Sequence, residues 1–136
     1  MVYATKVCYT KDMTYKNIFS GFSVTDLKKA QAFYTDILGL QVTDNKGMGL
    51  ELHLPRGGSI FIYEKPNHQP ATFTILNLEV EDIDPAVDEL VKKGITFTHY
   101  DNLPAPQDAK EILRGKGTGY GPDIAWLSIL PEIFCL

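Results

Sequence analysis

The chain has 136 residues, a length that fits one compact domain or two small half-modules that share a core. Hydrophobic residues make up 44% and charged residues 22% of the sequence, a globular composition that excludes a disordered chain. A net charge of −4 and the lack of any Lys/Arg cluster argue against nucleic acid or an anionic membrane surface as a partner.

The first half of the chain predicts one helix between strands. A β-type run covers 17–24, and apolar residues at helical spacing predict a helix over 26–38. Asp26 is suited to the N-cap and Gly39 to the left-handed C-terminal position of this helix. Strands are then expected at 41–43, 49–54 and 59–63, with a hairpin turn at Arg56-Gly57-Gly58.

The second half predicts the same order of elements. A β-type run at 72–80 precedes a helix over 82–93, for which Asp82 is the expected N-cap and Gly94 the terminator. Pro85 falls in the first turn, where its missing N–H costs little. Further strands are expected at 95–100, 124–130 and 133–136.

These two halves form an internal repeat. Val24-x-Asp26-Leu27 corresponds to Val80-x-Asp82-Ile83, and Ala30 corresponds to Ala86. Self-similarity at this scale is a stronger fold signal than any single element. The sequence therefore predicts one domain over residues 1–136, made of two βαβββ modules at about 17–64 and 72–136.

Cysteine usage and hydropathy bear on the compartment. Cys8 and Cys135 lie near opposite ends without C-x-x-C spacing, so neither a disulfide framework nor a zinc cluster is expected. No apolar run approaches the roughly 20 residues of a membrane helix, and the first residues lack the apolar region of a signal peptide. A cytoplasmic protein is the natural expectation.

Three segments carry a resemblance to a known family: FSGFSVTDLKKAQAFYTDILGL (19–40), TFTILNLEVEDIDPAVDELVKKGITF (72–97) and GPDIAWL (121–127). With them the sequence resembles the vicinal oxygen chelate superfamily, the glyoxalase/bleomycin-resistance/extradiol-dioxygenase group. The resemblance implies an α+β fold, in which eight strands form a curved, open, mixed sheet around a binding cavity with both helices outside. The fold leaves the reaction open, because it hosts isomerases, lyases, dioxygenases and metal-free drug-binding proteins.

The resemblance also implies where a metal would bind. The ligand positions of the metal-dependent members fall on Phe19, Ile62 and Ile75, and near Cys135. Divalent metals of this group need several N or O donors, which Phe and Ile do not supply. We therefore expect no metal and no cofactor at the usual place.

Strand alternation, anchored on Phe19 and Ile75 facing inward, predicts the rest of the lining. The expected ligand-binding residues on the strands are Phe19, Gly21, Ser23, Ile62, Ile75, Asn77 and Trp126. Asn77 either orients a ligand or satisfies a backbone group, and Trp126 belongs either to an aromatic platform or to the core. Glu64 and Glu79 are the carboxylates expected nearest the pocket, either as a catalytic base or as solvated strand ends.

The segment from Asp101 to Pro122 is long for a connection within a domain. It is expected either to be a mobile lid, from which Arg114 or Tyr120 reaches an anionic ligand, or to be a plain surface loop. The apolar last strand, if it lies at an open sheet edge, favours pairing with a second copy.

The predicted function is a metal-free small-molecule binding protein, a homodimer, that holds an apolar or aromatic ligand in its concave cavity. The alternative is a lyase, isomerase or dioxygenase with a non-standard metal site or a carboxylate base such as Glu64 or Glu79. A third reading is a structural or regulatory interaction module, which would bind no small molecule in the cavity.

Overall fold

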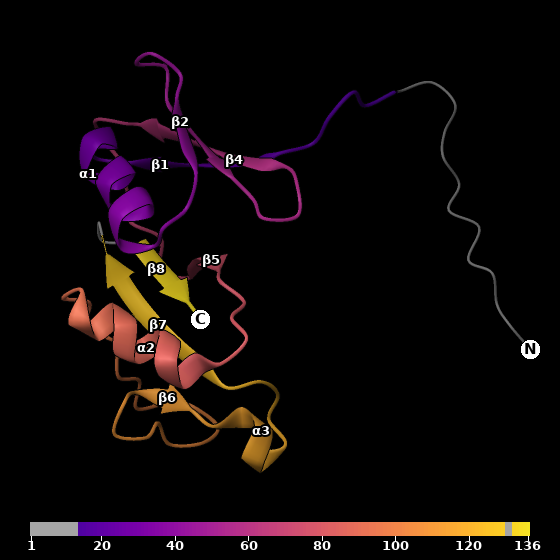
Figure 1. Ribbon diagram of the computed structural model, residues 1–136. Helices are drawn as coiled ribbons and strands as arrows, with labels where there is room; N and C mark the ends of the chain where they lie inside the picture. Colours follow the sequence, from indigo (N-terminus) through magenta and orange to yellow (C-terminus); the bar gives the residue numbers. More distant parts are fainter. Residues whose placement is uncertain (1–13, 130–131) are drawn as a thin grey trace, which may run out of the picture.

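The computed structural model describes residues 14–129 and 132–136, which form two four-stranded sheets with helices packed beside them (Figure 1). The first half contains β1 (Ser20–Val24), α1 (Leu27–Ala32), the π-helical turn η1 (Phe33–Ile37), β2 (Val42–Asp44), β3 (Leu50–His53) and β4 (Ser59–Glu64). The second contains β5 (Thr74–Asn77), α2 (Ile83–Lys92), β6 (Ile112–Leu113), α3 (Gly115–Thr118), β7 (Ile124–Ile129) and β8 (Glu132–Cys135).

Both sheets have the same strand order, which reflects the sequence repeat. The order is β1-β4-β3-β2 in the N-terminal sheet and β5-β8-β7-β6 in the C-terminal sheet. In each, the first strand pairs in parallel with the last, and the remaining pairs are antiparallel. The expected α+β architecture is thus present. The expected single eight-stranded sheet is not formed, because no strand of one sheet pairs with a strand of the other in the described residues.

The first helix begins and ends where the local sequence signals predict. The Asp26 carboxylate accepts a hydrogen bond from the backbone N–H of Lys29 at 3.0 Å, and Gly39 adopts φ = +68°. The last turn is wider than an α-helix, since the backbone N–H of Leu38 donates to the carbonyl of Phe33. Phe33 and Tyr34 are both buried there, with their rings edge to face at 5.3 Å.

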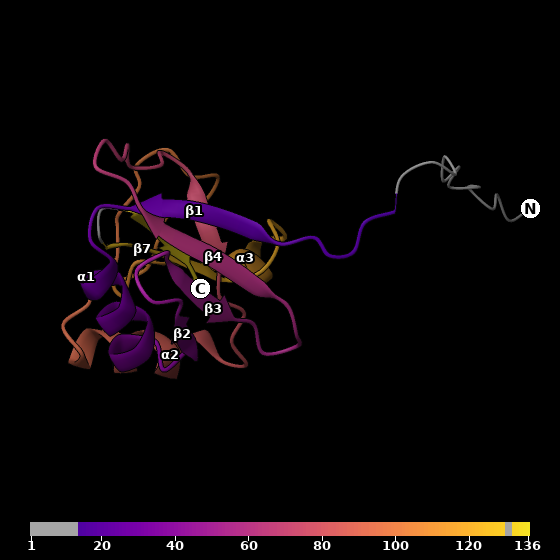
Figure 2. The ribbon, with the colours of Figure 1, turned by 90° about the horizontal axis from the view of Figure 1, so that it is seen from above.

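The second helix follows the same rules. Asp82 caps α2 by accepting from the N–H of Asp84, and Gly94 follows its end at φ = +89°. Lys93 Nζ donates to the carbonyl of Ile37 at 2.8 Å, which ties the end of α2 to the end of η1. Figure 2 shows α1 and α2 on the same side of the molecule, with β1 on the opposite side.

The edge of the C-terminal sheet differs from the expectation of a strand over 95–100. Within 95–100, Phe97 forms an isolated bridge to β7. The chain then leaves the sheet as a loop and returns to its edge as the short strand β6. The side chain of Gln107 spans the break, because its amide donates to the carbonyls of Thr98 and Glu111 at 2.9 and 2.7 Å. The expected long loop at 101–122 therefore contains β6 and α3 and is tied to the sheet.

The last strand is also placed differently from the expectation. β8 lies between β5 and β7, so it is an inner strand and not the open edge that was expected to attract a second copy. β1 and β5 are edge strands, because each has only one neighbouring strand in its sheet. In the part of the chain that is described, no helix has the length and apolar character needed to cross a membrane.

Candidate ligand-binding site

The N-terminal sheet has two chemically different faces. Phe22 and Val24 of β1 lie in register with Ile62 and Glu64 of β4, on the face that the helix covers. Ile62 is fully buried there, next to Leu50 of β3. The prediction that Ile62 lines the ligand cavity with Phe19 and Ser23 is wrong, because in-register neighbours point to the same side of a sheet. Ile62 belongs to the core.

The opposite face, here called the open face, is aromatic. Gly21 lies in register with Phe61, and Ser23 with Tyr63. The rings of Phe61 and Tyr63 are stacked with centroids 6.1 Å apart, and Tyr63 is 39% exposed. Gly21 adds no side chain in front of them, and a Cβ there would come within 3.0 Å of the Phe61 carbonyl. Phe19, just before β1, is also exposed.

A polar pair borders this aromatic surface. Ser23 Oγ lies 2.8 Å from Nδ1 of His68, which comes from the segment between the two halves. The same segment is held to β1 by a hydrogen bond from the N–H of Lys65 to the carbonyl of Val24. Ser23 is expected in the lining, and its contact with His68 joins residues 45 positions apart, a spacing that no local motif marks.

The C-terminal sheet has an open face of its own. Asn77 and Trp126 both lie in register with Cys135 of β8, so both point to the side away from the core residue Leu76. Trp126 is partly buried and meets Tyr100 edge to face at 5.5 Å. Ile75 does not join them as predicted: the register shifts between Thr74 and Leu76, and Ile75 packs against the core. Nothing is described of the side chain of Cys135, and Cys8 lies outside the described residues.

The two predicted carboxylates have different surroundings. Glu64 was expected near the pocket, but it lies on the helix side, where its Oε2 accepts a hydrogen bond from the N–H of Leu27 at 3.1 Å. A carboxylate at a helix N-terminus stabilises the unpaired N–H groups there. Glu79 is exposed and lines a cavity between the two halves of the molecule, together with Asn77.

The guanidinium of Arg114 binds neighbouring carboxylates. Its guanidinium donates two hydrogen bonds to Asp84, at 2.7 and 2.8 Å, and a further one to Asp108 at 2.8 Å. The hydrogen bond from Arg114 lowers the pKa of Asp84 from 3.8 to about 2, so this carboxylate stays ionised at neutral pH. These bonds hold Arg114 within the protein, and its contact with an anionic ligand stays a prediction. Tyr120 is exposed after the end of α3.

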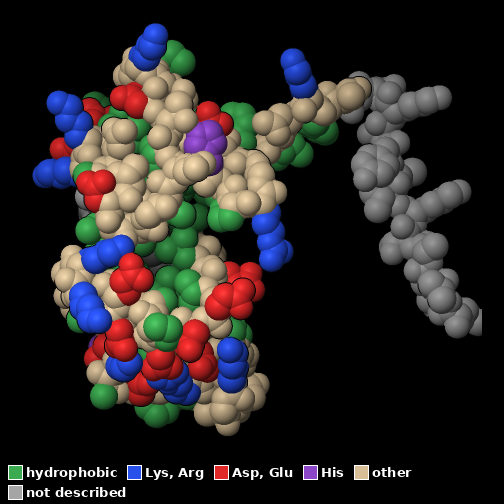
Figure 3. Space-filling view, in the orientation of Figure 1, with side chains coloured by type: hydrophobic (Ala, Val, Ile, Leu, Met, Phe, Trp, Pro, Cys, Tyr) green, Lys and Arg blue, Asp and Glu red, His purple; other side chains and the backbone are tan. Residues whose placement is uncertain are grey.

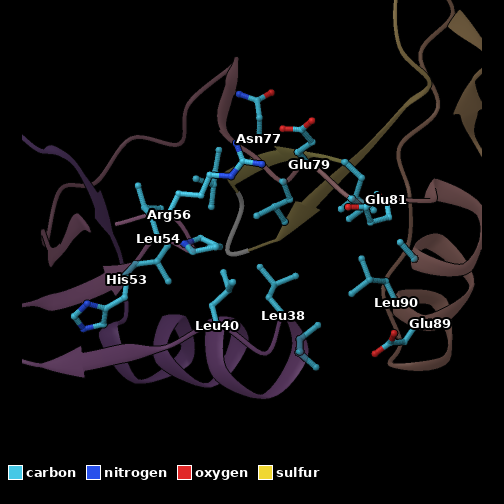
Figure 4. A pocket seen from close by; sticks show the side chains of 18 of the residues that line it. Leu38, Leu40, His53, Leu54, Arg56, Asn77, Glu79, Glu81, Glu89 and Leu90 are labelled. Carbon is cyan, nitrogen blue, oxygen red and sulfur yellow. The ribbon is translucent and has the colours of Figure 1, made fainter. Parts of the chain in front are cut away.

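A cavity of about 970 Å³ lies between the two halves. Figure 3 shows hydrophobic side chains gathered in the waist between the upper and lower halves of the molecule. Figure 4 shows Leu38 and Leu40 on one side of this cavity and Asn77, Glu79 and the guanidinium of Arg56 on the other. No alternation pattern predicted it, because its walls come from both sheets, η1 and α2.

The donor chemistry of the open face does not fit the metal site that the resemblance implies. Phe19 and Phe61 offer no ligand atom, and the donors on this face, among them Glu51 in register with Phe61 and His68 beside Ser23, are not grouped in threes. Across the described residues, no three His, Cys, Asp or Glu side chains are grouped so that they could hold a metal ion.

Comparison with known proteins identifies one family. The model of the glyoxalase/bleomycin resistance protein/dioxygenase superfamily matches residues 19–100. No curated protein matches the chain.

Solved structures share the fold at low sequence identity. FosX, a fosfomycin resistance protein from Listeria monocytogenes crystallised with Mn(II) and sulfate, is 17% identical, with a TM-score of 0.60 over 91% of this chain and 90% of its own. TnmS3, an antibiotic binding protein from Streptomyces sp. CB03234, is 20% identical, with a TM-score of 0.60 over 91% and 97%. A superfamily member from Sphaerobacter thermophilus is 19% identical, with a TM-score of 0.60 over 88% and 95%.

Proposed function

Because the chain belongs to the glyoxalase/bleomycin resistance protein/dioxygenase superfamily, we propose that it is a small-molecule binding protein that holds an apolar or aromatic ligand without a metal ion. The fold carries both antibiotic binding proteins, such as TnmS3, and proteins crystallised with a metal, such as FosX. Fold alone does not decide between these two classes. The residues of the open face support the metal-free binding class.

One observation carries the proposal: the stacked Phe61 and Tyr63 rings lie beside Gly21, with the Ser23–His68 pair next to them. Aromatic faces favour offset stacking with a flat ligand, and a neighbouring hydroxyl or imidazole supplies one polar contact. Asn77 and Trp126 provide the same combination, a polar amide and an aromatic ring, on the C-terminal sheet. The proposed ligand is therefore a flat, mainly apolar molecule with one polar group.

The proposal includes a homodimer, in which a second copy covers the free edges of β1 and β5. Large apolar side chains are exposed where the chain enters these strands: Tyr15, Ile18, Phe19 and Phe73, at 69, 81, 61 and 68%. Figure 1 shows the chain before β1 leading away from the body of the molecule. An unpaired strand edge flanked by exposed apolar residues favours pairing with another chain. Such a dimer would also enclose an open face that a single chain leaves exposed.

Enzymatic catalysis by a carboxylate base has less support. Of the two candidates, Glu64 is used at the start of α1, and Glu79 lies in the cavity between the halves and not on the aromatic surface. Binding alone needs only shape and a few hydrogen bonds, which the open face supplies.

Replacing Tyr63 with alanine is expected to weaken binding of 2-naphthol, a flat aromatic with one hydroxyl, by about tenfold, because half of the stacking surface is lost. Titration calorimetry measures the affinity of the metal-free protein. Val91→Ala is the control, since Val91 is exposed on α2 and does not belong to the open face, and it should leave the affinity unchanged. Equal affinities of all three proteins, or no saturable binding, would show that the open face is not the binding site.

A further inference from the structure

The cavity between the halves differs in chemistry from the open face. Its apolar lining comes mainly from leucines of both halves, among them Leu38, Leu40, Leu54, Leu76, Leu78 and Leu90, and charged and polar side chains lie beside them. No Phe, Tyr or Trp is among the lining residues of the described chain. A cavity of about 970 Å³ is as large as typical ligand pockets, at roughly 300–1,000 Å³. Its wall suits an aliphatic chain better than a flat ring.

The cavity excludes the aromatic rings of the open face, although Asn77 of the C-terminal sheet lines it. Leu52 lines it, and Leu52 lies in register with Ile60 on the helix face of the N-terminal sheet, opposite Phe61 and Tyr63. Leu76 lines it from the core side of the C-terminal sheet. A ligand in the cavity would therefore leave the aromatic surface free.

The charged side chains around the cavity differ in whether they already bind a partner within the protein. Lys93 is held by Glu89 at 3.0 Å and by the carbonyl of Ile37. Figure 4 shows the side chains of Asn77 and Glu79 directed away from Leu38 and Leu40, and the guanidinium of Arg56 on the same side as Asn77 and Glu79. Arg56 has no ion pair within the described part of the chain, and Lys116 and Glu81 also lie on the lining. Arg56 is thus the charge best placed to meet a head group at the mouth.

We infer that this cavity is a second binding site, for an aliphatic carboxylate whose chain lies among the leucines and whose head group binds Arg56. The planar guanidinium of arginine binds a carboxylate through two parallel hydrogen bonds, which gives both affinity and orientation. Burial of the chain supplies most of the binding free energy, at about 0.8 kcal/mol for each buried methylene. The site does not depend on the proposed aromatic ligand.

Titration calorimetry with sodium decanoate, 1-decanol and decyltrimethylammonium tests this inference, because the three probes share the chain and differ in head group. Decanoate is expected to bind with saturation and about tenfold more tightly than decanol, and the cationic probe more weakly still. Equal binding of decanoate and decanol, or no saturable binding of decanoate, would overturn the site.

Three variants assign the binding to the cavity. Arg56→Gln should weaken decanoate binding about tenfold, whereas Lys28→Gln, which removes the same charge from the exposed side of α1, should not. Ala86→Phe should block decanoate by filling the wall on α2. Tyr63→Ala should leave decanoate binding unchanged, which separates this site from the open face. An unaltered affinity in both Arg56→Gln and Ala86→Phe would contradict the assignment.

Discussion

Replacing Ile62 with alanine is expected to lower the free energy of unfolding by about 2–5 kcal/mol, the usual cost of emptying a buried aliphatic site. Ile62 is fully buried between Phe22 of β1 and Leu50 of β3, so the lost methyl and methylene groups leave a cavity that close-packed neighbours fill only in part. Urea unfolding measures the change, with the slope of the transition checked against the wild type.

The adjacent Tyr63→Ala variant is the matched control for Ile62. Tyr63 is on the open face and 39% exposed, so its replacement should cost much less stability than that of Ile62. If Tyr63→Ala were the more destabilising of the two, the assignment of the two faces of β4 would be reversed.

Replacing Gly115 with alanine is expected to destabilise the protein by about 1–3 kcal/mol, because there is no room for a side chain at this position. A Cβ on Gly115 would overlap the carbonyl oxygen of Pro122 and lie 2.7 Å from that of Gly121. The turn that would have to move carries Asp123, whose carboxylate accepts a hydrogen bond from the N–H of Lys116. Thermal unfolding followed by circular dichroism measures the loss.

Gly117 provides an internal comparison within the same short helix. Nothing lies within 4 Å of a Cβ built on Gly117, so Gly117→Ala should be neutral or slightly stabilising, as alanine favours a helix. Similar losses in both variants would show that the effect of Gly115→Ala comes from the backbone of α3 and not from contact with Pro122.

The helices were predictable because their signals are local. Asp26 and Asp82 cap the helices as expected, and Gly39 and Gly94 adopt the left-handed conformation that ends them. Each signal depends on a few neighbouring residues, and the repeat supplied it twice. The Arg56-Gly57-Gly58 hairpin was predictable for the same reason, since both glycines adopt positive φ.

The orientation of β4 was not predictable from alternation. Every residue of Ile60-Phe61-Ile62-Tyr63 is apolar or aromatic, so the two-residue period does not show which set is buried, and a one-residue error reverses the faces. In β5, the shift between Thr74 and Leu76 breaks the alternation that was used to place Ile75. Pairing across the sheet resolved both cases.

Contacts that are distant in sequence account for the remaining differences. Arg114 meets Asp84 from 30 positions away, and Ser23 meets His68 from 45. Neither pair has a spacing that any local motif would mark. The excursion before β6 was missed because the side chain of Gln107, and not a strand pattern, bridges the break.

The measurement that tests the central claim most directly is elemental analysis of untagged protein after incubation with Mn, Fe, Co, Ni or Zn salts and desalting. The account predicts that no metal remains in stoichiometric amount, because Phe19, Ile62 and Ile75 occupy the positions where the resemblance implies metal ligands. It also predicts that 2-naphthol binding is the same before and after incubation. One retained metal ion per chain, with binding that requires it, would contradict a metal-free binding protein and favour the enzyme.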